Sequence, residues 1–364
     1  MNTGPGNKLA WLAMAGVVAL AVAASSIDAQ TAGSKQATER LPLSPVILVE
    51  RPGVVREFSA DPQQVAQMVD HALLKLTSAQ DIATAWKRLG ITPQDVVGIK
   101  ITTAGGPALC THQPLVQAIC AGLELAGVPA SQIIIWDKFQ DKMRPAGYAL
   151  RASRGAYPAI ESVVPANYYD PSVFYRNDMA GNLIWGDFMF NQSLNMYDPV
   201  SNQIVCRSYF TKFVTQTCTK LINVPVLTDN QFVGISGCMS SLALGSVDNN
   251  RRFQGPPTYG TPAIDDILDR DFIRQKVVVH ILDALVAQCA GGPSFNPQFC
   301  ESWGALYVGR DPVAIDSLVL PKLEQMRRTM NVPPIGNTAN YIQMANFYSL
   351  GTTDRRRIQL VRIP

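Results

Sequence analysis

A strand, a helix and a second strand follow one another between residues 96 and 136, and this order constrains the fold more than any other feature of the chain. VVGIKIT (96–102) and IIIW (133–136) are short apolar runs of strand length, and PLVQAICAGLELAG (114–127) between them has apolar residues at helical spacing. Two strands joined through a helix of this length pair in parallel. The sequence therefore predicts an α/β fold, with a mainly parallel sheet and flanking helices.

Further apolar runs extend this sheet. The expected strands are KLINVPVL (220–227), VVVHIL (277–282), ALYVG (305–309) and RIQLVRI (357–363). Helices are expected to begin at Asp61-Pro62 and at Asp311-Pro312, because Asp caps a helix and Pro suits its first turn. Residues 150–215 are rich in Tyr, Asn, Asp and Phe, which predicts a β-rich insertion on the main sheet.

The first 29 residues have the order of a secretion signal. Lys8 precedes an uncharged run of 16 residues, Leu9 to Ala24, and small residues follow. A membrane-spanning helix needs about 20 apolar residues, so a membrane contact is expected only if the signal stays uncleaved. The candidate cleavage points follow Ala23, Ala24 and Ala29. We expect a periplasmic or secreted protein, exported by the Sec-type route since no Arg-Arg pair precedes the run.

Residues 30–60 are expected to form a linker and an extended segment, followed by a single domain over residues 61–364. Hydrophobic residues make up 47% of the chain and charged residues 16%, enough apolar material for a large core. The formal net charge is only +3, which argues against a nucleic-acid partner.

Seven cysteines follow the signal, and an oxidising compartment favours their pairing. Cys289 with Cys300 would close a Gly- and Pro-rich loop, and Cys206 with Cys218 is the second candidate pair. The odd count leaves at least one thiol unpaired unless it bonds to another chain.

Polar residues at expected strand ends are the candidates for chemistry. Lys100 lies inside an apolar strand, where an ammonium needs a carboxylate, an anion or open solvent. Ligands of open α/β sheets bind beyond the carboxyl ends of the strands. Asp137 directly follows IIIW, Asp283 directly follows VVVHIL, and Asn223 lies within KLINVPVL. If these strands are neighbours, the four side chains face one crevice.

Two further residues belong to this hypothesis. His112 lies at the start of the helix after the Lys100 strand, where free N–H groups can receive an anion. Asp229, together with Asp137 and Asp283, leaves a divalent metal site open, because hard cations favour carboxylates. The sequence contains no C-x-x-C, no G-x-G-x-x-G and no Gly-Lys-Ser/Thr loop, so neither an iron–sulfur nor a nucleotide motif is present.

Four segments, in order, resemble the bacterial family catalogued as domain of unknown function 362, over about residues 95–320. They are the stretch from VVGIKITTAGGPALCTHQP to IIIWDK, LINVPVLTDNQFVGISGCMSSLALGSVDNNRRF, ILDALVAQCAGGP and GRDPVAIDSLVL. The resemblance implies an α/β fold and draws attention to Thr111 beside the residues already named. Relatives are often exported, and some carry an attached iron–sulfur domain. The family supplies no activity.

The chain also departs from the family's pattern at positions that carry polar or basic groups in relatives. Thr228 and Asn230 stand where relatives tend to have Lys and His, and Ser240-Ser241 where they have Lys-Asn. If those groups bind an anion in relatives, this chain is expected to bind a different ligand or to have lost the activity.

The leading functional hypothesis is an extracytoplasmic enzyme or ligand-handling protein that binds a small anion or a metal. Lys100 would neutralise the ligand, Asp137 and Asp283 would serve as acid/base or metal groups, and His112 would carry a proton. Thr111, Asn223 and Asp229 would contact the ligand. The alternative is a non-catalytic interaction protein that uses the 150–215 insertion. A third interpretation treats Lys100 and its carboxylate as an ion pair of the core.

Overall fold

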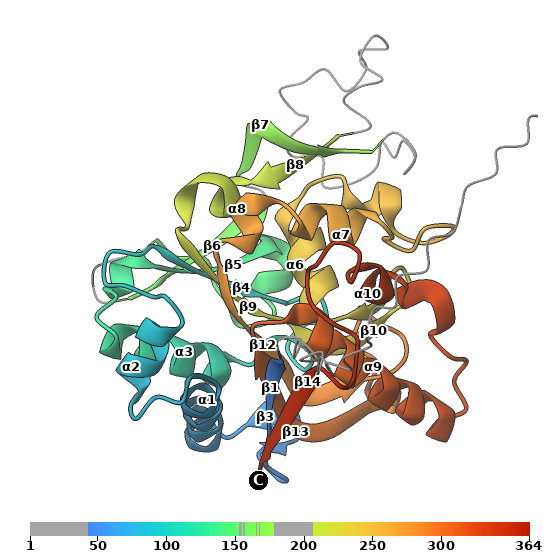
Figure 1. The fold of residues 1–364 in the computed structure, drawn as a ribbon, viewed down its shortest axis with the longest axis horizontal. Helices are drawn as coiled ribbons and strands as arrows, with labels where there is room; N and C mark the ends of the chain where they lie inside the picture. Colours follow the sequence, from blue (N-terminus) through green and yellow to red (C-terminus); the bar gives the residue numbers. More distant parts are fainter. Residues whose placement is uncertain (1–42, 153–154, 156, 165, 167, 178–206) are drawn as a thin grey trace, which may run out of the picture. The chain divides into compact units, whose positions relative to one another are not determined.

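The computed structural model describes residues 43–152, 155, 157–164, 166, 168–177 and 207–364. These residues form a large, mostly parallel mixed sheet with helices on both faces, so the predicted α/β class is confirmed (Figure 1). The strands follow the order β14–β1–β13–β12–β9–β4–β5–β6, and β10 and β11 branch off beside β12. β13 and β11 run antiparallel to their neighbours, whereas the other pairs of this sheet are parallel.

The strands of this sheet are β1 (Ser44–Glu50), β4 (Val97–Ile101), β5 (Ile133–Phe139), β6 (Ala159–Val164), β9 (Lys220–Val224), β10 (Val226–Asn230), β11 (Gly234–Ser236), β12 (Val277–Gln288), β13 (Cys300–Gly309) and β14 (Ile358–Ile363). The principal helices are α1 (Pro62–Thr77), α2 (Ile82–Arg88), α3 (Gln113–Leu125), α4 (Gln140–Met143), α6 (Cys238–Ser246), α7 (Ala263–Leu268), α8 (Asp271–Arg274), α9 (Pro312–Thr329) and α10 (Tyr341–Met344). A small hairpin consists of β2 (Val55–Arg56) and β3 (Ser59–Ala60).

The predicted unit around residue 100 is present, because β4 and β5 pair in parallel and α3 connects them. Both predicted helix starts are also confirmed. Asp61 accepts hydrogen bonds from the backbone of Gln63 and Gln64, and Asp311 accepts one from Ala314. These carboxylates satisfy N–H groups that have no partner inside the helix, which fixes where α1 and α9 begin.

The domain includes residues that the sequence placed ahead of it. β1, within the expected linker and extended segment of residues 30–60, pairs with both β13 and β14 in the main sheet. Its central residues Val46 to Val49 are buried, so this strand is part of the core. The boundary expected at residue 61 therefore lies too far along the chain.

The β-rich insertion is narrower than expected at its start. β6 lies inside the expected range of 150–215, yet it pairs in parallel with β5 and forms an edge of the main sheet. The following strands, β7 (Tyr169–Arg176) and β8 (Arg207–Thr211), form a separate antiparallel pair. Most of the intervening chain, 178–206, lies outside the described residues.

The two faces of the sheet carry separate helix groups. α1, α2 and α3 contact one another on one face, where Val97, Ile99 and Ile101 of β4 are buried (Figure 1). α6, α7, α9 and α10 pack on the other face, over Leu221 and Leu282. Because successive strand residues point to opposite faces, Lys100 of β4 points toward the α6 side.

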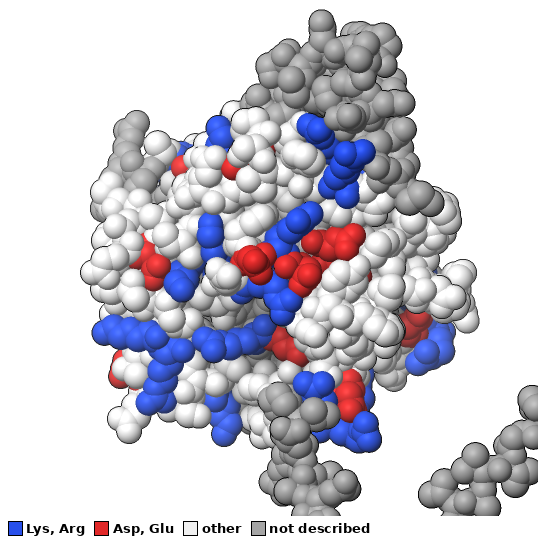
Figure 2. All heavy atoms as spheres, turned by 45° about the horizontal axis from the view of Figure 1, so that its top comes forward, with Lys and Arg blue, Asp and Glu red and all other residues white. Residues whose placement is uncertain are grey.

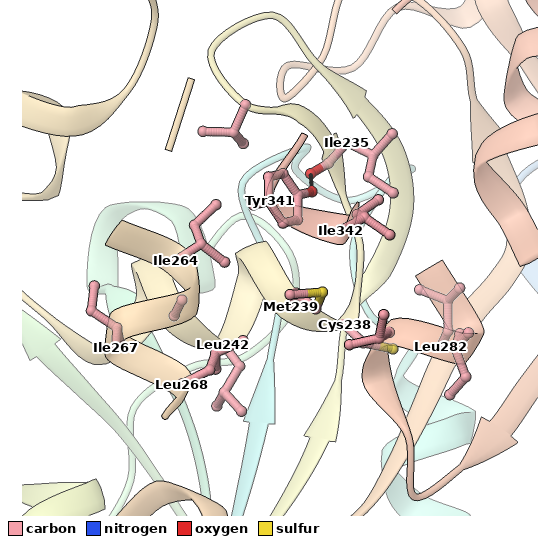
Figure 3. Close-up of a cluster of buried hydrophobic side chains, with 14 of the residues drawn as sticks. Ile235, Cys238, Met239, Leu242, Ile264, Ile267, Leu268, Leu282, Tyr341 and Ile342 are labelled. Carbon is pink, nitrogen blue, oxygen red and sulfur yellow. Dashed lines mark hydrogen bonds between the residues drawn. The ribbon is translucent and has the colours of Figure 1, made fainter. Parts of the chain in front are cut away.

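α6 is held firmly in place above this second face. Figure 3 shows Met239 and Leu242 of α6 among Ile264, Ile267 and Leu268 of α7, with Tyr341 and Ile342 of α10 beside them. The Tyr341 hydroxyl donates a hydrogen bond of 3.1 Å to the carbonyl of Ile235, just before α6. The helix therefore gives a rigid wall to the space beside Lys100.

The predicted disulfide between Cys289 and Cys300 is absent, and both thiols are free. Cys300 lies directly opposite Gln288 across β12 and β13, so Cys289, the next residue, points to the opposite face. Accordingly, the Cys289 sulfur lies 3.5 Å from that of Met330, while the Cys300 sulfur contacts Gln288 Oε1. Cys218 is also free, and its predicted partner Cys206 lies outside the described residues.

Candidate functional site

Lys100 and Asp137 form a buried ion pair where β4 and β5 lie side by side. Lys100 Nζ is 2.9 Å from Asp137 Oδ1 and donates a second hydrogen bond, of 2.6 Å, to the carbonyl of Ile101. Asp137 also accepts from the backbone N–H of Lys138 and from the N–H and hydroxyl of Thr103. Both carboxylate oxygens are thus fully engaged, and they join the Lys100 strand to the loop that follows it.

A glycine of α6 makes room for the Lys100 side chain. A Cβ atom at Gly245 would lie 2.4 Å from Lys100 Cε and 2.9 Å from its Nζ, too close for any real contact. The helix therefore passes directly over the ammonium group, and a side chain at residue 245 would force the end of the Lys100 side chain to move.

His112 and Asp283 form a second charged pair. Asp283 Oδ2 accepts a hydrogen bond of 2.9 Å from the His112 backbone and lies 2.8 Å from His112 Nδ1. Burial lowers the pKa of His112, but the charge of Asp283 and the hydrogen bond to it outweigh this effect, so the pKa is raised above its usual value. Asp283 is completely buried, and the pair joins the start of α3 to β12.

The position of Asp283 differs from the expected one. The sequence placed Asp283 just after a strand ending at Leu282, but β12 continues to Gln288 through pairing with β13 and β10. Asp283 is therefore inside a strand and lies on the α3 side of the sheet, since its neighbours Leu282 and Ala284 belong to the core on the α6 side. It is a core residue and not a strand-end group.

The other predicted contact residues stabilise the fold locally. Thr111 donates a hydrogen bond of 2.7 Å to the carbonyl of Val224. Asn223 donates to the carbonyl of Cys238 at 2.8 Å and to His280 Nδ1 at 3.1 Å. Burial lowers the pKa of His280 to about 3, which keeps its ring neutral as an acceptor.

Asp229 does not meet the other two carboxylates proposed for a metal. It accepts from the backbone of Gly292 at 2.9 Å and lies 3.8 Å from Arg327 Nη1, while burial raises its pKa. Gly292 is necessary there because a Cβ would lie 2.0 Å from the Asp229 carbonyl. Within the described ranges, no three His, Cys, Asp or Glu side chains are grouped as a metal ion requires. The expected site of Asp137, Asp283 and Asp229 is thus not assembled.

A cavity of about 620 Å³ opens beside the Lys100–Asp137 pair. Its basic side chains come from β4, from β5 and α4, and from the turn after α6, and they are Lys100, Lys138, Lys142 and Arg251. Other sides of the cavity carry polar groups and apolar groups. The polar residues include Asn230, Ser236, Ser240 and Ser241, and the apolar ones include Phe139, Phe232, Leu244 and Pro293. His112, Thr111, Asn223, Asp229 and Asp283 are not among its lining residues.

The cavity lining is rich in cationic side chains. Four of them, Lys100, Lys138, Lys142 and Arg251, lie beside the carboxylate of Asp137. In the described part of the chain, the Arg251 guanidinium has no hydrogen bond or ion pair, and Lys142 has only a 3.7 Å contact with the exposed Asp141. Sequence reasoning missed Lys138, Lys142 and Arg251, although Lys138 directly follows Asp137 and Lys142 lies one helical turn beyond it.

Asn230, Ser240 and Ser241, three of the four residues expected to differ from the family's pattern, line this cavity. Ser240 donates to the carbonyl of Ile235, whereas Ser241 has no partner for its hydroxyl among the residues described. The Ser241 hydroxyl can therefore donate to a ligand in the cavity.

The N-terminus of α6 is already satisfied from within the protein. The carboxylate of Asp316, on α9, accepts hydrogen bonds of 2.7 and 2.9 Å from the backbone of Cys238 and Met239. Burial raises the pKa of Asp316 to about 7. A ligand in the cavity thus meets the side chains along α6, and the helix end is closed to it.

Near the centre of the face drawn in Figure 2, Lys and Arg side chains lie beside Asp and Glu side chains. The helices in the described part of the chain are all too short or too polar to cross a bilayer.

Residues 195–320 match the sequence model of the family described as Domain of unknown function (DUF362), which confirms the predicted resemblance over those residues. No curated protein matches the chain. A crystal structure of a protein from Thermotoga maritima resembles it with a TM-score of 0.37 and 7% sequence identity, covering 80% of this chain and 60% of that one. The chain therefore spans less than two thirds of the length of that protein.

Proposed function

We propose that this protein is exported from the cytoplasm and binds a small anion in the cavity beside Lys100. The observation that carries the proposal is the group of four cationic side chains in the lining of a cavity of about 620 Å³, among which Arg251 has no partner in the described part of the chain. Arg251 supports it most directly, because a guanidinium without a protein partner retains its full capacity for a carboxylate or a phosphate.

The same contacts favour binding over acid–base chemistry by the predicted residues. Both oxygens of Asp137 are occupied by four donors, so this carboxylate is poorly placed to take a proton from a ligand. His112 and Asp283 are engaged with each other away from the cavity lining. Lys100 would then contribute charge at the cavity wall, held in place by Asp137.

The binding proposal is tested by titrating the purified protein calorimetrically with inorganic phosphate, methylphosphonate and phenylphosphonate. We expect saturable binding of at least one of them, weakened about tenfold or more by Arg251→Gln, since a charged hydrogen bond contributes about 1.5–3 kcal/mol. Arg251 is exposed, so this variant should fold normally. Arg88→Gln, which alters an Arg outside the cavity lining, is the matched control. Absence of binding by all three anions, or equal binding by wild type and Arg251→Gln, would contradict the proposal.

Export rests on the signal-like order of residues 1–29 and is tested separately. The intact mass of the protein recovered from the extracytoplasmic fraction should correspond to cleavage after Ala23, Ala24 or Ala29. A full-length chain recovered only from the cytoplasmic fraction would refute export and leave the binding proposal untouched.

A further inference from the structure

We propose that the anion is an organic one that carries an apolar group, with its charge toward the basic side chains and its apolar part against Phe139, Phe232 and Leu244. This inference rests on the proposed anion binding and adds the chemical class of the ligand. It follows from the size of the cavity, from its apolar lining and from the distance between the two kinds of side chain.

The cavity is too large for an inorganic anion. Its volume of about 620 Å³ lies in the range of about 300–1,000 Å³ that is usual for sites binding small organic molecules. One water molecule occupies about 30 Å³ of liquid, and an inorganic oxyanion is only a few times larger. Such an ion would leave most of the cavity filled with water.

The apolar side chains of the cavity are positioned before any ligand arrives. Phe232 is 42% exposed and lines the cavity. Its backbone is nevertheless fixed: its N–H donates to Asn230 Oδ1 at 2.9 Å, and its carbonyl accepts from Gly255 at 2.7 Å. Phe139 at the end of β5 and Leu244 on α6 are half-buried in the same lining. An apolar group bound there would remove these surfaces from water.

Charge and apolar surface lie close enough for one small molecule to reach both. Lys138 Nζ is 5.3 Å from the centre of the Phe139 ring. An anionic group and a ring separated by one or two bonds match this spacing. A larger, uncharged apolar ligand would supply no anionic partner for Arg251.

Two phosphonates with the same anionic group separate this inference from the proposed function. Titrated calorimetrically into the purified protein, phenylphosphonate should bind about tenfold more tightly than methylphosphonate, because its ring leaves water. Phe232→Ala should remove most of this preference, measured as the ratio of the affinities for the two phosphonates. Phe347→Ala is the matched control, since Phe347 is 85% exposed and does not line the cavity.

The outcomes are distinct. Equal affinity for the two phosphonates, both dependent on Arg251, would overturn the inference and leave the proposed anion binding intact. A preference for phenylphosphonate that survives Phe232→Ala would also overturn it, because the ring would then lie elsewhere. Absence of binding by both compounds would contradict the inference and the proposed function together.

Discussion

The Lys100–Asp137 and His112–Asp283 pairs have similar chemistry and different surroundings. In the first, the side chains of Lys100 and Asp137 are 4% and 11% exposed, and both residues line the cavity. In the second, Asp283 has no exposed surface and neither residue reaches the cavity. A charged residue in an apolar strand can therefore belong either to a ligand site or to an ion pair between core elements. Whether the pair lines a cavity distinguishes the two cases.

Each pair connects two parts of the fold, but the two carboxylates differ in the other hydrogen-bond donors that they have. Asp137 has three donors besides Lys100, and the cavity is open beside it. Asp283 has, apart from His112, only the backbone N–H of Leu285 at 3.1 Å among the contacts of the described chain. Loss of one partner should therefore lower the free energy of unfolding more in the His112–Asp283 pair than in the Lys100–Asp137 pair.

The largest expected effect is that of Asp283→Ala. It leaves the His112 ring and two backbone N–H groups without an acceptor in a dry environment, and breaking a buried pair of this kind costs about 3–5 kcal/mol of unfolding free energy. Urea denaturation measures this loss. Asp141→Ala is the matched control, because the Asp141 side chain is 72% exposed and its loss should change stability by less than about 0.5 kcal/mol. A cost below about 1 kcal/mol for Asp283→Ala would show that the pair is not a structural bond.

Lys100→Met should have a smaller effect on stability and a clear effect on binding. The remaining carboxylate keeps three donors, so we expect a loss of about 1–3 kcal/mol in urea denaturation. Binding of phenylphosphonate should weaken about tenfold or more, because the cavity loses a cation and Asp137 repels the ligand. A stability loss as large as that of Asp283→Ala, with unchanged binding, would assign Lys100 to the core alone.

The pH dependence of stability distinguishes the pairs with a smaller effect. The pKa of His112 in the folded protein is raised above its usual 6.5. The contribution of its charge is therefore complete below about pH 6.5 and is lost as the pH rises through the folded-state pKa. Wild type should lose stability toward alkaline pH more steeply than His112→Asn, as urea denaturation between about pH 5 and 9 would measure.

Two other carboxyl groups also make the folded protein less stable as the pH rises, so wild type has to be compared with His112→Asn. Burial raises the pKa of Asp265 to about 8 and that of Asp316 to about 7, so each keeps its proton in the folded state and disfavours folding as the pH rises. Both groups are present in wild type and in His112→Asn, and the difference in slope isolates His112. Identical slopes would mean that folding leaves the pKa of His112 unchanged.

Local sequence signals predicted most of the fold. The βαβ unit around residue 100 and the Asp61 and Asp311 caps depend on neighbouring residues, and the structure has them where they were expected. A carboxylate partner for Lys100 was also expected from the sequence, with Asp137 and Asp283 as the candidates, and the structure pairs Lys100 with Asp137.

Features that depend on pairing between strands far apart in the sequence could not be predicted in the same way. The length of β12, and with it the burial of Asp283, depends on β13 and β10, which are far away in sequence. Arg251 lies in NNRRF, where the sequence gives no sign that its guanidinium faces a cavity formed with β4 and β5. The free Cys289 and Cys300 depend on the register of the same two strands.

Substitution of Lys142 should have the smallest effect among the changes in the cavity beside the Lys100–Asp137 pair. Its side chain is 55% exposed at the cavity, and its one ion pair, with Asp141, spans 3.7 Å. Lys142→Met should weaken phenylphosphonate binding only about two- to threefold, because solvent and salt screen an exposed charge, and should not alter stability measurably.

Repeating the titration at low and high ionic strength checks the cause: the difference from wild type should shrink as salt is added. Lys75→Met, at an exposed position of α1, should bind as wild type does at every salt concentration. If Lys142→Met weakened binding more than Lys100→Met does, the ligand charge would lie at the exposed side of the cavity, away from the buried pair.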